Sequence, residues 1–541
     1  MSPGGPLAPS VEGAPGREPK WLWTVALVAV AVTAFSVRLA MVLRGSGLDG
    51  KLAYDDGVYY SAADSLVWGR LPYRDFILLH PPGIVLALAP FAVFGRLTHD
   101  ALGFESARIG WMLLGSVNAV LVLGVARRLG LVAALAGGLF YAVWQPVAVT
   151  ETTTRLEPLV SLGVLVGLLV LANPLGERSR RAQVLAGCAL GLALVVKIWA
   201  VVPVLVVLLL CRSRLGTRAT LRVAAAAGVS AAVVAVPFWL AARSDMFRMV
   251  VLDQLGRPHL RATTSQRLAG ILGFSSWTPW AWATALCLGT LVAMAVLARR
   301  SLARWAVGML AVQVLVLVLS PSYFSFYAAY PAPALALAVA GGVACLDAGF
   351  ARARTTTVAS AARARRPALM AVGVGLAWLV TVDAETSVGV ALPTAELSRL
   401  TASSHCVTAD SPVDLVLLDV LSRDLARGCR VMVDVSGLTY DRDSASAQAA
   451  GRLPRRRNRA WQHDLRAYLL SGDTTLLSRP HADGLSAHTL RVIDGLTVLG
   501  RGAGYELLAT SPTAPSPATT GTRTTGRASG PVPPPRQEGT S

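Results

Sequence analysis

Residues 21–42 read WLWTVALVAVAVTAFSVRLAMV, an apolar run as long as the roughly 20 residues with which a helix crosses a bilayer. Similar runs follow at residues 131–149, 159–172, 184–210, 223–240, 278–298 and 303–319. A single run of this kind could be a signal peptide, but several cannot, and the first run is too long for a signal-peptide core. The sequence therefore predicts a multi-pass α-helical membrane protein.

The composition agrees with this assignment. Hydrophobic residues make up 54% of the 541 residues and charged residues only 15%, against about a quarter in a typical soluble domain. The net charge of +19 raises nucleic-acid binding as an alternative. The arginines, however, stand in short clusters between the apolar runs, as in the cytoplasmic loops of membrane proteins. We therefore expect a membrane lipid environment and no nucleic-acid partner.

The arginine clusters orient the chain in the plasma membrane. The N-terminus should share the cytoplasmic side with the clusters at residues 127–128, 178–181, 212–222, 299–304 and 352–366. This requires residues 184–210 to enter the membrane and return, with a turn near Lys197 and Pro203. It also requires residues 80–95 to lie along the outer surface rather than span. About eleven transmembrane helices result, and the C-terminal part is extracytoplasmic.

The chain divides into four regions. We expect a disordered cytoplasmic N-terminus (1–20), a transmembrane catalytic domain (21–383) with a large first outer loop (44–106), an extracytoplasmic α/β domain (384–509) and a disordered tail (510–541). Short strands are predicted at residues 413–418, 430–435, 465–470, 489–492 and 496–499, because Gly, Pro and Asp punctuate these apolar runs. Cys406 and Cys429 lie in the outer domain, where oxidising conditions permit a disulfide, so we predict that they are bridged.

Charged residues on the predicted outer face are the candidates for chemistry, since a charge at membrane depth is costly. The densest group is in the first outer loop, where the adjacent carboxylates Asp55 and Asp56 precede Asp75 and His80. A solvated loop with a turn after Asp56 would explain the acidic pair taken alone. Further polar groups on the same face are Arg108, Arg155, Lys197, Arg257 and Tyr327. A lone Lys197 would more often be a residue that snorkels to the interface.

This set of side chains fits glycosyl transfer from a lipid-linked phosphosugar. A phosphate leaving group needs no proton, so one carboxylate that deprotonates the acceptor hydroxyl is enough, where a glycosidase needs two. Cations must instead meet the departing negative charge, and Lys197, Arg257 and His80 are suited to that. Adjacent residues of an extended segment point in opposite directions, so only one of Asp55 and Asp56 should face the cavity.

The order of these motifs resembles the GT-C superfamily of polyprenyl-phosphate-sugar-dependent glycosyltransferases. That superfamily includes protein O-mannosyltransferases, aminoarabinose transferases and actinobacterial mannosyl- and arabinosyltransferases. The resemblance covers about residues 20–345 and rests on Asp55-Asp56, the segment 73–75, His80-Pro81-Pro82, Arg108, the segment 191–197 and the aromatic segment 323–331. The chain departs from the common pattern at Asp56, where Glu is usual, and at Gly83, where many relatives have Leu. Both departures leave the sugar undecided.

The resemblance implies an inverting transfer to an acceptor hydroxyl on the extracytoplasmic side. Asp55 would be the base, and Asp56 would orient the acceptor or help to bind a metal. The donor phosphate would be bound by His80, Lys197, Arg257 and Tyr327, with Asp75, Arg108 and Arg155 as further candidates. A divalent metal at Asp55 or Asp56 is the one cofactor left open. The high Ala, Arg and Gly content indicates an actinobacterium, which favours mannose or arabinose as the sugar and a cell-envelope glycan, lipid or protein as the acceptor.

Two other classes of protein are open on the residues alone. A transporter or flippase of lipid-linked sugars should show internal repeats, or broken helices at matched positions in two halves, and the sequence displays neither. A membrane anchor that presents the outer domain as a binding module would leave the acidic pair in the first outer loop unexplained.

Cysteine labelling tests the predicted topology. We expect a membrane-impermeant thiol reagent added to intact cells to modify Ser46→Cys and to leave Ser213→Cys unmodified, because the positive-inside pattern places these serines on opposite faces. The unsubstituted protein, with its own cysteines, gives the background. Modification of both positions from outside would contradict the topology and, with it, the outer position of the acidic pair.

Overall fold

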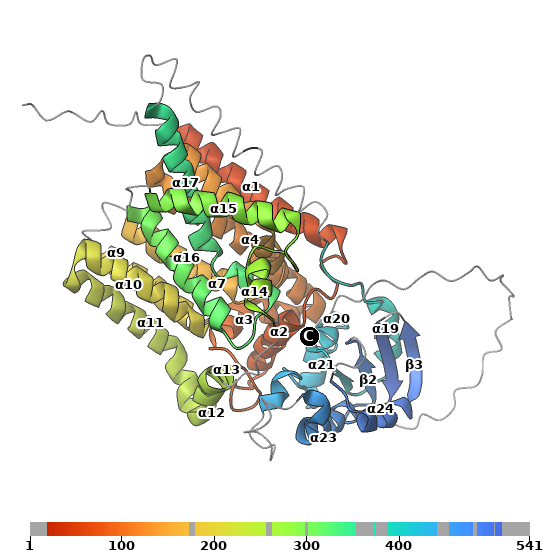
Figure 1. The fold of residues 1–541 in the computed structure, drawn as a ribbon. Coiled ribbons are helices and arrows are strands. Elements are labelled where there is room, and N and C mark those ends of the chain that lie inside the picture. The colour runs from red at the N-terminus through yellow and green to blue at the C-terminus, as the bar shows by residue number, and fades with distance from the viewer. Residues whose placement is uncertain are drawn as a thin grey trace, which may run out of the picture.

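The computed structural model describes residues 19–172, 179–255, 262–297, 301–352, 373, 387–440, 454–479, 484–502 and 504–510. Helices form the chain as far as residue 352, and a small sheet follows near the C-terminus (Figure 1). Arg257, all but residue 373 of the predicted span near residues 369–382, and almost all of the two predicted disordered segments lie outside the described residues.

Six helical segments in the described part of the chain are long and apolar enough to cross a membrane: α1 (Lys20–Arg44), α4 (Asp100–Ala126) continued to Leu129, α10 (Val201–Leu215) together with the turn that begins at Ile198, α11 (Thr217–Ala242), α15 (Pro279–Leu297) and α16 (Ser301–Leu319). Four shorter apolar helices accompany them: α3 (Gly83–Leu97), α5 (Leu131–Val143), α7 (Glu157–Ala172) and α17 (Ala332–Arg352). The chain is thus a multi-pass membrane protein, while the count of eleven spans stays a prediction.

Shorter elements connect these helices. They are α2 (Tyr54–Val67), η1 (Arg127–Leu129), α6 (Gln145–Thr150), α9 (Arg180–Leu194), η2 (Ile198–Ala200), α12 (Ser244–Phe247), η3 (Arg248–Leu252), α13 (Asp253–Leu255), α14 (Thr264–Ile271) and η4 (Ser325–Ala329). The chain does turn near Lys197, since α9 ends at Leu194, Lys197 is extended and α10 begins at Val201. Helix α11 packs against both α9 and α10 (Figure 1).

Glycine at position 83 fixes the His-Pro-Pro segment beside this turn. The backbone N–H of Gly83 donates to the carbonyl of Val195 at 2.7 Å. A Cβ atom at position 83 would lie only 2.6 Å from the same oxygen. This close approach explains why the chain has glycine here, where many relatives have leucine. Helix α3, which starts at Gly83, packs against α2 and α4 and has 15 residues. Its predicted place on the outer surface stays a prediction.

The C-terminal unit, defined here as the described residues from 387 to 510, contains a four-stranded sheet in the order β1-β2-β4-β3. Strand β1 (Val407–Ala409) is parallel to β2 (Thr474–Leu477), and β4 (Tyr505–Ala509) is antiparallel to both β2 and β3 (Thr497–Gly502). The helical elements are α19 (Thr394–Thr401), α20 (Pro412–Leu417), α21 (Leu421–Ala426), η5 (Gly437–Tyr440), η6 (Arg455–Arg457), α23 (Arg459–Leu469) and α24 (Ala487–Asp494).

Most of the predicted strands in this unit are wrong. Residues 413–418 lie in α20, 465–470 largely in α23 and 489–492 in α24, residues 430–435 form no strand, and only 496–499 overlaps a strand, β3. Short apolar runs do not distinguish a buried helix from a strand. In α23 the buried residues Trp461, Leu465 and Tyr468 follow the spacing of a helix. This spacing in the sequence indicates a helix rather than a strand.

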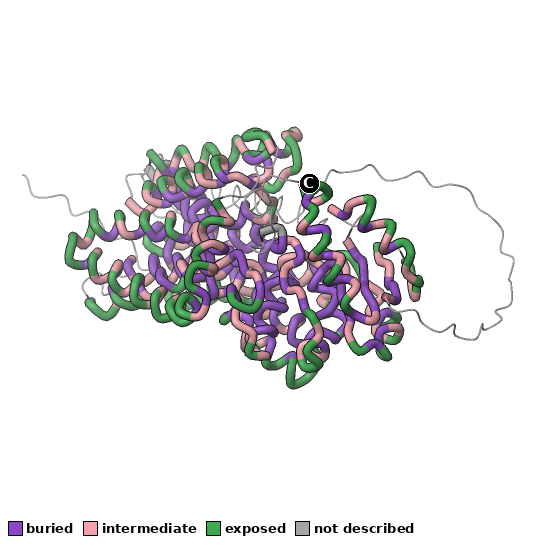
Figure 2. Tube along the Cα trace, turned by 90° about the horizontal axis from the view of Figure 1, so that it is seen from below, coloured by how far each residue is buried: buried purple, intermediate pink, exposed green. Residues whose placement is uncertain are grey.

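The predicted disulfide between Cys406 and Cys429 is present, with Cα atoms 5.7 Å apart. It joins the residue before β1 to the end of the segment that contains α20 and α21. Helix α20 packs in turn against α2. The buried core runs without a break from the helices into the C-terminal unit (Figure 2), so the bridge stabilises the part of this unit that contacts α2.

A group of carboxylates lies where the C-terminal unit meets α2 and α4. The Ser422 backbone N–H donates to Asp100 at 2.8 Å, and its hydroxyl donates to Asp64 at 3.1 Å. Asp419 accepts from the Asp100 backbone N–H at 2.5 Å and pairs with the His99 ring at 2.9 Å. Burial, followed by the nearby Asp100 charge, raises the pKa of Asp64 to about 8, although Ser422 and Arg96 act in the opposite direction.

Replacing Asp64 with Asn should therefore change how stability depends on pH. The unfolded chain releases the Asp64 proton near pH 4 and the folded protein near pH 8, so the wild type loses stability as pH rises across this window. Asn mimics the protonated form. We expect the Tm of Asp64→Asn to exceed that of the wild type by an amount that grows from pH 5 to pH 9.

The Tm of detergent-solubilised protein, followed by intrinsic fluorescence, measures this effect. Asp75→Asn is the matched control, because the hydrogen bond from Arg74 lowers the pKa of Asp75 and no gain at high pH is expected from it. A difference in Tm between Asp64→Asn and the wild type that does not vary with pH would contradict the prediction.

Candidate active site

The acidic pair lies in the first turn of helix α2 and not in the extended segment that we assumed. Carboxylates are favoured there because the N-terminal end of a helix carries partial positive charge. Successive helical residues point about 100° apart, so Asp55 and Asp56 still face different surroundings.

Asp56 is fully buried, and both of its oxygens are engaged. Its Oδ2 accepts from Nε and Nη2 of Arg108 at 2.9 and 2.7 Å. Its Oδ1 accepts from the backbone N–H and the hydroxyl of Thr154 at 2.8 and 2.7 Å. Arg108, on α4, also donates to the carbonyl of Gly50 at 2.8 Å. Asp56 thus joins α2, α4 and the turn before α7.

Asp55 differs from Asp56 both in its exposure and in its hydrogen bonding. Its side chain is 33% exposed, and its Oδ2 accepts from Nη1 of Arg155 at 2.9 Å. Within the described part of the chain its other oxygen, Oδ1, accepts no hydrogen bond. The Arg155 guanidinium lies over the ring of Phe326, with Cζ 3.6 Å from the ring centroid, and this cation–π contact holds the cation in place beside Asp55.

Lys197 is buried in the turn between α9 and η2, so it is not a residue that snorkels. Its ammonium group is ion-paired with Glu157, the first residue of α7. The same group lies 4.3 Å from the ring centroid of Tyr327 and 4.6 Å from that of Trp199. The pairing with Glu157 compensates the burial of both charges.

Tyr59 connects the two ion pairs. Burial raises the pKa of its hydroxyl, the charges of Asp55 and Glu157 raise it further, and the charge of Arg155 lowers it. The ring of His80 packs edge-on against the Tyr59 ring, with centroids 5.8 Å apart. The structure thus brings Asp55, Arg155, Lys197, Tyr327 and His80 around one tyrosine.

Asp75 belongs to a different environment. Its carboxylate pairs with Arg74 at 2.8 Å and accepts from the backbone N–H of Leu71 at 2.7 Å, which closes the loop between α2 and α3. Among the described residues, no three of His, Cys, Asp and Glu come together as metal ligands. Since Arg108 and Thr154 use both oxygens of Asp56, and Arg155 uses one of Asp55, the acidic pair does not fit a divalent metal.

A buried charge pair that we did not predict supports the turn before α7. Arg38, on α1, is ion-paired with Glu151 and donates to the carbonyl of Ala142 at 2.9 Å. The hydroxyl of Tyr141 donates to Glu151 at 2.9 Å. Arg38 is a charge within an apolar run, which marks a residue with a specific partner and was a signal available in the sequence.

The C-terminal unit also reaches the acidic pair. The hydroxyl of Tyr54, the residue before Asp55, donates to Asp434 at 2.9 Å and accepts from the backbone N–H of Ser436 at 2.9 Å. The Arg479 guanidinium lies over the Tyr54 ring, 4.4 Å from its centroid. No local pattern in the sequence indicates these contacts, since they join residues 380 or more positions apart.

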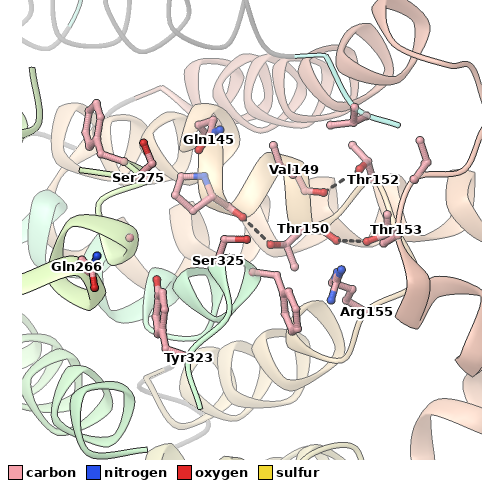
Figure 3. Close-up of a pocket in the computed structure, with 18 residues that line it drawn as sticks. Gln145, Val149, Thr150, Thr152, Thr153, Arg155, Gln266, Ser275, Tyr323 and Ser325 are labelled. Carbon is pink, nitrogen blue, oxygen red and sulfur yellow. Dashed lines mark hydrogen bonds between the residues drawn. The ribbon is translucent and has the colours of Figure 1, made fainter. Parts of the chain in front are cut away.

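A cavity of about 480 Å³ opens beside Arg155. Polar residues of α6, the turn after it, α14, the segment that follows α14 and the segment around η4 line it (Figure 3), namely Gln145, Thr150, Thr152, Thr153, Gln266, Ser275, Tyr323 and Ser325. Apolar atoms of Val149, Phe274 and Phe326 complete the wall. Arg155 is the one charged residue among the described residues that line the cavity, and Asp55 lies behind it.

Comparison with known proteins shows what this arrangement is similar to. Residues 78–321 match the family model of Glycosyltransferase family 87. None of the curated proteins matches the chain significantly. The structure of ArnT from Cupriavidus metallidurans bound to undecaprenyl phosphate superposes with a TM-score of 0.59 at 16% identity, over 91% of this chain and 99% of that chain.

A second similar structure is the archaeal oligosaccharyltransferase AglB from Archaeoglobus fulgidus, in complex with an inhibitory peptide and a dolichol-phosphate. Its TM-score is 0.50 at 10% identity, over 85% of this chain and 69% of that chain. The fold is that of the GT-C glycosyltransferases, and the family model agrees. The chain is a multi-pass membrane protein with the GT-C fold, and its match to a glycosyltransferase family model over residues 78–321 agrees with the enzyme that the sequence motifs predicted.

The Asp56–Arg108 pair should be essential for folding. Arg108→Met leaves a buried carboxylate without its cation, which typically costs about 3–5 kcal/mol, so we expect a large fall in Tm and in the yield of folded protein. Arg155→Met is the matched control, because its partner Asp55 is one-third exposed and such pairs contribute about 1 kcal/mol or less. Equal losses of stability in the two variants would contradict this assignment.

Proposed function

We propose that this glycosyltransferase moves a sugar, mannose or arabinose, from a polyprenyl-phosphate donor to an acceptor hydroxyl on the extracytoplasmic side, with inversion and with Asp55 as the general base. The observation that carries the proposal is the contrast within the acidic pair. Asp56 has no oxygen left for a substrate, whereas Asp55 is partly exposed and keeps one oxygen unused in the described part of the chain.

The reaction then needs one proton transfer at this carboxylate. Asp55 accepts the proton of the acceptor hydroxyl, the hydroxyl oxygen forms a bond to the anomeric carbon, and the bond from that carbon to the phosphate oxygen breaks. The polyprenyl phosphate leaves with the electron pair and needs no proton. Asp56 contributes by fixing the first turn of α2, through Arg108 and Thr154.

The cations around Tyr59 are suited to the phosphate of the donor. Lys197 and Arg155 both lie within this cluster, and His80 and Tyr327 stand next to Tyr59 and Lys197. Fixed cations in a site that excludes water stabilise a leaving phosphate strongly. Arg257, which falls outside the described residues, stays a candidate for the same role.

A lipid-linked donor is supported by the apolar helices that surround this cluster and by the ligands of similar structures. ArnT was solved with undecaprenyl phosphate and AglB with a dolichol-phosphate. The acceptor, a glycan, lipid or protein of the cell envelope, is proposed from the resemblance stated above. The inverting outcome follows from direct displacement by a single base.

Replacing Asp55 by Asn tests the proposal. We expect transfer from radiolabelled polyprenyl-phosphate mannose or arabinose, measured in membranes, to fall at least about 100-fold, as for loss of a general base. The Tm should stay close to that of the wild type, because Asp55 is not part of the buried contact between Asp56, Arg108 and Thr154. Asp75→Asn, the matched control, should retain near-normal transfer.

Two outcomes would contradict the assignment. One is near-normal transfer by Asp55→Asn together with loss of transfer by an Asp56→Asn variant whose Tm is unchanged, which would make Asp56 the base. The other is near-normal transfer by both variants, which would show that neither carboxylate is a base.

A further inference from the structure

The residue before Asp55 is held by the C-terminal unit. The hydroxyl of Tyr54 donates to Oδ1 of Asp434 at 2.9 Å and accepts from the backbone N–H of Ser436 at 2.9 Å. The backbone N–H of Gly437 donates to the same oxygen of Asp434 at 2.8 Å, which fixes this carboxylate in its turn. The tyrosine hydroxyl thus donates to and accepts from one short segment of the C-terminal unit.

The surroundings of Tyr54 preserve this hydrogen bond. Burial, followed by the charge of Asp434, raises the pKa of the Tyr54 hydroxyl, while Arg479 and Ser436 act in the opposite direction. The hydroxyl therefore keeps the proton that it donates to Asp434. The Arg479 guanidinium makes a cation–π contact with the ring, 4.4 Å from its centroid, and donates to the hydroxyl of Ser436 at 3.2 Å. The C-terminal unit thus holds both the ring and the hydroxyl.

The stretch before α2 is held at a second position, Lys51, four residues before Asp55. The backbone N–H of Lys51 donates to the carbonyl of Val390 at 2.9 Å, and its carbonyl accepts from the Val390 N–H at 3.0 Å. Its ammonium group pairs with the buried carboxylate of Asp414 at 3.0 Å and donates to the carbonyl of Ser478 at 3.3 Å. Breaking such a pair would leave a buried charge, so the chain enters α2 from a fixed point.

The first turn of α2 also lies directly against α20 of the C-terminal unit (Figure 1). A Cβ atom at Gly57 would lie only 2.4 Å from the backbone nitrogen of Val413, in α20. Gly57 follows Tyr54 by three residues, so both lie on one face of α2. The C-terminal unit therefore contacts this face along the whole first turn.

A helix that is attached through one side chain can still turn about that point. Asp56 attaches α2 to the membrane domain, through Arg108 and Thr154, and Tyr54 attaches it to the C-terminal unit. Asp55 lies between these two attachments. We propose that Tyr54 is a positioning residue for Asp55, and that the C-terminal unit sets the orientation of this carboxylate through Tyr54. The inference rests on the proposed function, in which Asp55 is the base.

Replacing Tyr54 by Phe removes the hydroxyl and keeps the ring. We expect the maximal rate of transfer from radiolabelled polyprenyl-phosphate mannose or arabinose, with native membranes as the source of acceptor, to fall at least about tenfold, because a small misplacement of a reacting group is costly. The KM for the donor should stay within about twofold, since donor binding is not altered. Tyr505→Phe, on strand β4 of the same unit, is the matched control and should retain normal transfer.

A double variant separates positioning from a general structural role. Residues that act on the same step have effects that do not combine independently. If Tyr54 acts through Asp55, then adding Tyr54→Phe to Asp55→Asn should lower the residual transfer by less than about twofold. A further loss of about tenfold would show that Tyr54 acts independently of Asp55 and would overturn the inference.

Hydrogen–deuterium exchange of the full chain in nanodiscs tests the same contact without any measurement of activity. The amides of residues 58–61 close the first turn of α2, and we expect them to exchange at least about threefold faster in Tyr54→Phe than in the wild type or Tyr505→Phe. Unchanged exchange in Tyr54→Phe would overturn this inference and leave the proposed function standing. Near-normal transfer by Asp55→Asn would instead overturn the proposed function, while faster exchange in Tyr54→Phe would still establish that the C-terminal unit orients α2.

Discussion

The buried contact between Asp56, Arg108 and Thr154 is the interaction on which the rest of the site depends. Two charges removed from water are stable only when nearly every hydrogen-bonding position is used, and here four hydrogen bonds reach one carboxylate. The three residues belong to α2, α4 and the turn before α7. Any movement of one element against the others would leave a buried charge unpaired, so the geometry around Tyr59 is rigidly held.

This clamp also explains how two adjacent carboxylates acquire different roles. Asp55 follows Tyr54 and precedes Asp56, while Arg155 follows Thr154, so the two segments meet residue by residue: Asp56 with Thr154 and Asp55 with Arg155. The inner pair is dry and fully bonded. The outer pair lies at the edge of the cavity, where one oxygen of Asp55 is unused in the described part of the chain. The proposed function thus gives the structural role to Asp56 and the chemical role to Asp55, its neighbour in the same helical turn.

The sequence could predict the participants more readily than their partners. The acidic pair, Lys197 and the Cys406–Cys429 disulfide stand out because charged residues near apolar runs, and cysteines in a domain predicted to be extracytoplasmic, are informative by themselves. Asp56 is the aspartate whose oxygens are all used in hydrogen bonds because Arg108 and Thr154 contact it, and these residues lie 52 and 98 positions from Asp56 in the sequence. Most of the strands predicted for the C-terminal unit were wrong for a related reason. Short buried runs take the secondary structure that tertiary packing allows.

The charges around Tyr59 indicate how donor binding could prepare the base. Among the described residues, Asp55 and Glu157 balance Arg155 and Lys197, so the cluster is neutral before a phosphate enters. A phosphate adds negative charge, and one cation must turn from its carboxylate toward it. Lys197 and Glu157 are almost completely buried, with 4% and 1% of their side chains exposed, whereas Asp55 is 33% exposed. The Asp55–Arg155 pair is therefore the one that separates at the lower desolvation cost, and its separation would free the carboxylate that we propose as the base.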